Sequence, residues 1–113
     1  MVAISFSVFK EKILNGKKRQ TIRLMNTKWC RVFDKVEDYY SIKLQLYWKQ
    51  RSKENELLME TDLKSIYPKL LEQLTLQDAL NDGFESLEEL KSWFKLTYNK
   101  VDFRFQYLAV IQW

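Results

Sequence analysis

The residue types with the most chemical potential in this sequence lie close together in the segment Gly16-Lys17-Lys18-Arg19-Gln20-Thr21-Ile22-Arg23. Side chains alternate across a strand, so Thr21 and Arg23 share one face if residues 20–25 are extended. An ammonium group, a hydroxyl and a planar guanidinium then offer donors that suit a phosphate or another anion. The segment is predicted to bind an anionic, nucleotide-like ligand. The alternative is a solvated basic turn with a Thr-x-Arg pair at the surface.

A second cluster of basic and aromatic residues is Tyr47-Trp48-Lys49-Gln50-Arg51-Ser52-Lys53. Alternating positive charges and aromatic rings suit contact with a phosphate backbone together with base stacking. An ordinary strand with Trp48 in the core, followed by a charged turn, explains the same residues. Lys49 and Arg51 are retained as candidate contacts.

The third candidate is Asp82, which precedes Gly83 and Phe84. A carboxylate at a helix end could accept a hydrogen bond from a Lys or Thr across a cleft. A helix that simply ends at a glycine explains the pattern equally well in structural terms.

Composition limits the chemistry that such groups could perform. The chain has no histidine and one cysteine, Cys30, so the commonest metal ligand and the commonest general base are absent. We expect no metal and no cofactor, and any catalysis must use Lys, Thr, Ser, Tyr, Asp or Glu. One cysteine permits no internal disulfide, and no stretch resembles a signal peptide or a membrane span. These features predict a cytoplasmic protein without a membrane partner.

The charges are unevenly distributed along the chain. Residues 1–53 hold 13 Lys and Arg against 4 Asp and Glu, whereas residues 54–113 hold 6 against 11. The asymmetry indicates either a basic face directed at a polyanion or two segments that neutralise each other in the fold.

The elements that must position these residues form one predicted domain over residues 1–113. Periodicity, caps and turn residues predict five strands and three helices. The strands are Val2–Phe6, Gln20–Met25, Ser41–Gln50, Leu57–Tyr67 and Phe103–Trp113. The helices are Val8–Asn15, capped by Ser7, then Leu74–Asp82, capped by Thr75, and one that Ser86 opens and that ends near Asn99. Residues 26–40 are predicted to be irregular. Strands without regular helical crossovers indicate an α+β fold, a small mixed sheet or partly closed barrel with helices outside.

The run from Ile13 to Arg23 resembles the signature of the ASCH domain, a relative of the PUA domain. The pattern I-L-x-G-x-K-x-x-T-x-R is matched without gaps. Two further segments, Leu46–Arg51 and Asn81–Leu90, are similar to archaeal-type members, so the resemblance covers nearly the whole chain. It implies a PUA-like mixed β-barrel with flanking short helices, and a cleft lined by the Gly-Lys loop. RNA or a modified nucleoside is the ligand that the resemblance implies.

Some small bacterial members of that family hydrolyse acetylcytidine to cytidine with a Lys, a Thr and a Glu. The Lys corresponds to Lys18 and the Thr to Thr21. The Glu falls nearest Asp82, by an alignment that needs a one-residue gap, and Asp is one methylene shorter.

The main functional hypothesis is binding of RNA or a modified nucleoside. Its contacts would be Lys17, Lys18, Arg19, Thr21 and Arg23, extended by Lys49 and Arg51. The alternative is a metal-independent amidohydrolase for acetylcytidine-like nucleosides, with Lys18, Thr21 and Asp82 as catalytic residues. Further alternatives are a ribonuclease, or a module that binds a small metabolite or a protein.

Overall fold

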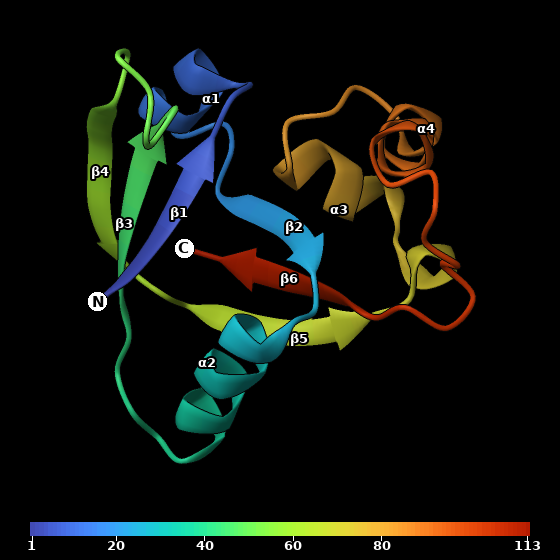
Figure 1. Ribbon diagram of the computed structural model, residues 1–113, viewed down its shortest axis with the longest axis horizontal. Coiled ribbons are helices and arrows are strands. Elements are labelled where there is room, and N and C mark those ends of the chain that lie inside the picture. The colour runs from blue at the N-terminus through green and yellow to red at the C-terminus, as the bar shows by residue number, and fades with distance from the viewer.

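The computed structural model describes residues 1–113 and contains two three-stranded sheets with helices around them (Figure 1). In the first sheet, β3 (Lys43–Trp48) lies between β1 (Val2–Phe6) and β4 (Glu56–Asp62). It pairs with β1 in parallel and with β4 antiparallel. In the second sheet, β6 (Leu108–Gln112) lies between β2 (Gln20–Leu24) and β5 (Ser65–Lys69), antiparallel to both. The α+β prediction is confirmed, but the strand pairing gives two separate sheets and shows no closed barrel.

Strand β6 is the central strand of its sheet and supplies two cores. Its residues 108–111 are fully buried, which fits a run that is apolar on both faces of the strand. Ala109 and Ile111 face the first core, which fills the space between the two sheets. Leu108 and Val110 face the second core, beneath α3 (Leu76–Asn81) and α4 (Leu87–Thr97).

The predicted strand Leu57–Tyr67 is wrong as a single element, because the chain changes sheets within it. The backbone N–H of Leu63 still donates to Ile42, the residue before β3 of the first sheet, whereas that of Lys64 donates to Gln112 in β6 of the second. The second half also extends past its predicted end to include Pro68. Proline is tolerated there because β5 is an edge strand, which needs hydrogen bonds on one side only.

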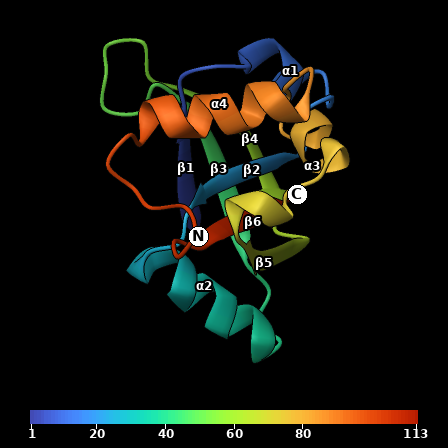
Figure 2. The ribbon, with the colours of Figure 1, turned by 90° about the vertical axis from the view of Figure 1, so that its right-hand side faces the viewer.

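Residues 26–40, predicted to be irregular, contain the helix α2 (Thr27–Glu37). The Asn26 side chain caps it by accepting a hydrogen bond from the N–H of Trp29. Trp29, Val32, Phe33 and Val36 recur at helical spacing and pack on the first core. In Figure 2, α2 lies at the opposite end of the molecule from α3 and α4.

The remaining differences concern where elements begin and end. Helix α1 (Lys10–Leu14) begins two residues later than predicted, because Phe9 adopts a left-handed conformation with φ of 64° and displaces the Ser7 cap. The last strand begins at Leu108, whereas residues 103–105 form a turn and residues 106–107 belong to no helix or strand. A short 3-10 helix (Leu71–Gln73) precedes α3.

The caps of α3 and α4 agree with the sequence. The Thr75 hydroxyl accepts from the N–H of Asp78, and the Ser86 hydroxyl accepts from that of Glu89. Gly83 follows α3 with φ of 101°, as a helix end requires. None of the helices has the length and apolar character that crossing a membrane would require.

Candidate ligand pocket between the two sheets

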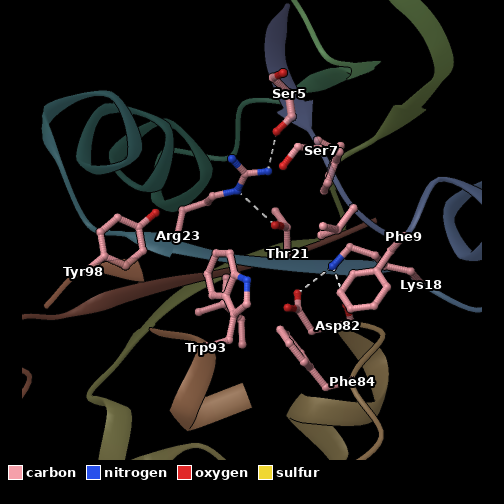
Figure 3. Close-up of a pocket in the computed structure, with 13 residues that line it drawn as sticks. Ser5, Ser7, Phe9, Lys18, Thr21, Arg23, Asp82, Phe84, Trp93 and Tyr98 are labelled. Atoms are coloured by element: carbon pink, nitrogen blue, oxygen red, sulfur yellow. Dashed lines mark hydrogen bonds and ion pairs between the residues drawn. The ribbon is translucent and has the colours of Figure 1, made fainter. Parts of the chain in front are cut away.

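A pocket opens where the edge strand β1 of the first sheet faces the edge strand β2 of the second (Figure 3). Helices α3 and α4 complete its wall. The cavity holds about 90 Å³, and one water molecule needs roughly 10–15 Å³ of such space. It therefore suits one ring or acyl group of a ligand, with the remainder outside the mouth. The lining residues are Ser5, Phe6, Ser7, Val8, Phe9, Lys18, Thr21, Ile22, Arg23, Asp82, Phe84, Trp93 and Tyr98.

Thr21 and Arg23 lie on the same face of β2, as strand alternation predicted. The Arg23 Nε donates to the Thr21 hydroxyl at 3.0 Å, and its Nη2 donates to the carbonyl of Ser5 at 2.8 Å. The guanidinium also lies 5.0 Å from the ring centre of Phe6. Arg23 thus bridges two strands that share no ladder, and it satisfies a carbonyl on the unpaired edge of β1.

Lys18 and Asp82 form an ion pair at the inner end of the pocket. The Lys18 Nζ lies 2.9 Å from the Asp82 Oδ1 and also donates to the Asp82 backbone carbonyl. Backbone hydrogen bonds bring the two residues together. The N–H of Lys18 donates to the carbonyl of Lys12, and the N–H of Arg19 donates to the carbonyl of Asn81, which precedes Asp82. In Figure 3, Thr21 lies between Arg23 on one side and the Lys18–Asp82 pair on the other.

Burial changes the protonation chemistry of this pair. Desolvation raises the pKa of Asp82 to about 6, although the charge of Lys18 and the N–H of Ile22 both favour the carboxylate. Desolvation also lowers the pKa of Lys18, opposed by its contact with Asp82. The positive charges of Arg23 and Lys12 add to the lowering of the Lys18 pKa.

Aromatic rings form the outer part of the wall. Phe9 and Phe84 pack edge to face, with ring centres 5.2 Å apart. The ring centre of Trp93 lies 6.2 Å from that of Phe84. Trp93 is 37% exposed at the rim and packs on Tyr98. Trp93 lies in α4 and Tyr98 directly follows it. Both are far from the basic loop in the sequence, so no local pattern indicated that they would meet it.

The other predicted contacts lie elsewhere. Lys17 and Arg19 flank Lys18 but are exposed and line a different hollow, together with Lys64. Lys49 forms an ion pair with Glu54 in the turn after β3, and Arg51 is exposed in the same turn. Of the predicted residues, the structure therefore brings together Lys18, Thr21, Arg23 and Asp82.

The pocket offers no site for a metal. No group of three or more His, Cys, Asp or Glu side chains lies together anywhere in the structure. The polar groups available to a ligand are one carboxylate, one ammonium, one guanidinium and hydroxyls.

The fold and pocket define a small α+β domain with a polar pocket between two sheet edges. The chain is similar to the crystal structure of an ASCH domain from Lactobacillus crispatus JV V101, with a TM-score of 0.63 and 14% identity over 98% of this chain and 76% of that one. No family model and no curated protein matches the sequence. The protein thus has an ASCH-like fold, in agreement with the resemblance of its Ile13–Arg23 segment.

Proposed function

We propose that the pocket binds one nucleoside-like group, either a modified nucleoside or a base of RNA. The observation that carries this proposal is the convergence of the Lys18–Asp82 pair, Thr21 and Arg23 inside an aromatic wall. A nucleobase edge presents donors and acceptors side by side, and the pocket opposes them with a carboxylate, an ammonium and a hydroxyl. The ring of a base can stack on aromatic side chains, and Trp93 stands at the rim.

The charge balance of the pocket supports the same ligand class. Lys18 and Arg23 contribute two positive charges and Asp82 one negative charge, so the site keeps one positive charge in excess. That excess suits a neutral base whose sugar or phosphate remains near the mouth. Because Arg23 is fixed by Thr21 and Ser5, little side-chain ordering is needed on binding.

Titration of the protein with cytidine, acetylcytidine, uridine and adenosine, followed by Trp fluorescence and calorimetry, tests the proposal. Thr21→Val removes one hydroxyl and leaves the Arg23 Nε without its acceptor, so we expect about tenfold weaker binding. Thr61→Val, the same change in β4 outside the pocket, is the control and should bind like the native protein. Absence of saturable binding for every nucleoside would contradict the proposal.

Hydrolysis of an acylated nucleoside is a second candidate, favoured by the lowered pKa of Lys18 beside a buried hydroxyl. The neutral amine would take the proton of the Thr21 hydroxyl, whose oxygen forms a bond to the acyl carbon. The C–N bond then breaks, and the amine of the nucleoside leaves with the proton from Lys18. Water hydrolyses the resulting Thr21 ester, which releases the carboxylic acid. Lys18 contacts Asp82 in this structure, so its amine must turn toward Thr21 when ligand enters.

Incubation with acetylcytidine, followed by chromatography of the products, tests the second candidate. We expect cytidine and acetate from the native protein, less from Thr21→Ser and none from Thr21→Ala. Binding of acetylcytidine without turnover would reject hydrolysis and leave the binding proposal standing.

A further inference from the structure

Three surface hollows outside the pocket are neighbours, because each shares lining residues with the next. The first lies between the N-terminus, α2 and the start of β3, and has a volume of about 520 Å³. The second, about 500 Å³, shares Tyr40 and Lys43 with the first. The third, about 240 Å³, shares Lys64 with the second. We call this surface the basic track; its charged residues are Arg31, Lys35, Lys43, Asp62, Lys64, Arg19 and Lys17.

The basic track carries six cations and one carboxylate. That carboxylate, Asp62, is paired with Lys43 at 2.6 Å. None of the other five cations forms an ion pair, and all five are exposed. The acidic residues Asp34, Glu37 and Asp38 belong to α2 or its end, but they line none of the three hollows.

Exposed aromatic rings stand beside these cations at the C-terminal end of α2. Tyr40 lines two of the hollows and is 66% exposed. Tyr39, which precedes it with φ of 64°, is 97% exposed. Neither ring is needed to fill a core, so both are free to stack on a flat partner.

From these observations we propose that the basic track binds single-stranded nucleic acid. Unpaired cations along a groove hold the phosphate backbone, and Tyr39 and Tyr40 provide a stacking surface for bases. This surface is distinct from the pocket, although the two meet at one loop: Lys18 points into the pocket, whereas Lys17 and Arg19 line the track. The proposal does not depend on which small ligand the pocket takes.

Fluorescence anisotropy with a labelled oligouridylate of about 12 nucleotides, within the range such grooves bind, tests the proposal at several salt concentrations. Each phosphate contact contributes a slope of about −0.7 to a plot of log K against log salt for single strands. The triple variant Arg19→Gln/Arg31→Gln/Lys64→Gln should therefore flatten the slope by about two and bind at least tenfold more weakly at low salt. The double variant Tyr39→Leu/Tyr40→Leu should weaken binding without changing the slope.

Two controls separate the basic track from general charge and from the pocket. Lys91→Gln/Lys95→Gln/Lys100→Gln removes three unpaired cations from α4 and the segment after it, and should leave binding close to native. Thr21→Val changes the pocket, and a loss of oligonucleotide binding there as large as in the Arg19/Arg31/Lys64 variant would place the oligonucleotide in the pocket and overturn the proposal. Equal losses in the two triple variants, or no binding of RNA or DNA oligonucleotides at low salt, would overturn the proposal. Circular dichroism establishes that each variant is folded.

Discussion

Lys18 and Asp82 hold opposite charges where water scarcely reaches them, with side chains 3% and 7% exposed. Burial disfavours both ions, which is why the pKa of Asp82 rises and that of Lys18 falls. Apolar residues of similar size often stabilise a fold better than such a pair does. A ligand that needs both charges therefore explains the pair better than stability does.

Replacement of Lys18 alone should reduce the stability of the fold far more than replacement of Lys18 and Asp82 together. Lys18→Met leaves the Asp82 carboxylate buried without its cation, and should lower the free energy of unfolding by about 3–5 kcal/mol at pH 7.5. The loss should shrink at pH 5, because Asp82 is then protonated and no longer carries a buried charge. Urea denaturation of both proteins at the two pH values measures it. Lys18→Met/Asp82→Asn should recover most of the stability; a double variant as unstable as the single one would contradict the argument.

Ligand binding and stability should respond to Asp82 in opposite directions between pH 5 and pH 7. The pKa of Asp82 is about 6 in the fold, above the unfolded value of 3.8. Its contribution to stability is thus complete below the unfolded value and is lost as pH rises through about 6. A ligand that requires the carboxylate should instead bind more tightly as pH rises through about 6. Calorimetric titration with the best nucleoside across this range tests the prediction, and Asp82→Asn should remove the pH dependence.

The sequence allowed part of the pocket to be predicted at the level of single residues. Thr21 and Arg23 were placed together correctly because a strand has a fixed alternation. Asp82 was a candidate because it follows a helix and precedes a glycine, and the structure places its buried carboxylate in the pocket beside Lys18. Lys17 and Arg19 were predicted to bind the same ligand as Lys18. In the structure, the Lys18 side chain lines the pocket, whereas Lys17 and Arg19 line a different hollow. Trp93 comes from a distant helix, and such a contact leaves no local pattern in a sequence.

The two glycine turns position the elements that form the pocket, and they offer a matched comparison. Gly16 and Gly83 have φ of 79° and 101°, so alanine is strained at both positions. A Cβ at Gly16 would meet no atom within 4 Å, whereas one at Gly83 would lie 3.2 Å from the Phe9 ring. Gly16→Ala should therefore cost about 1 kcal/mol of stability. Gly83→Ala should cost more.

The two substitutions should also differ in their effect on ligand binding. The Phe9 ring lines the pocket, so its displacement in Gly83→Ala should weaken nucleoside binding several-fold. Gly16→Ala should retain native affinity. Thermal denaturation and the fluorescence titration measure the two quantities. Equal effects of both substitutions would show that the Phe9 contact does not matter.

At the level of elements, helices could be predicted where a cap and an apolar period lie within a few residues of each other. The capping groups of α3 and α4 are where they were predicted. Helix α2 carries comparable features in Asn26 and in the spacing of Trp29, Val32 and Val36, so the prediction that residues 26–40 are irregular was wrong. The passage from β4 to β5 could not be predicted in this way, because one extended segment looks the same whether it serves one sheet or two. Partner strands far away in the sequence decide that.

The whole molecule depends on β6, which joins the two cores. One face of the strand packs between the sheets, and the other packs beneath α3 and α4. Displacement of β6 from one core would therefore expose the apolar residues of the other core as well. The pocket lies between the same two sheets, so its geometry depends on both cores remaining packed.

We therefore expect the two cores to unfold together as one cooperative unit. Leu108→Ala removes a fully buried side chain from the second core, and Ile111→Ala removes one from the first. Each should lower the free energy of unfolding by about 2–5 kcal/mol. Because β6 is shared, either variant should reduce amide hydrogen-exchange protection equally in β3 and in α4. Leu96→Ala, at an 80% exposed position on α4, is the control. It should change neither the free energy of unfolding nor the hydrogen-exchange protection. Loss of protection confined to α4 in Leu108→Ala, with β3 unaffected, would show that the two cores unfold independently.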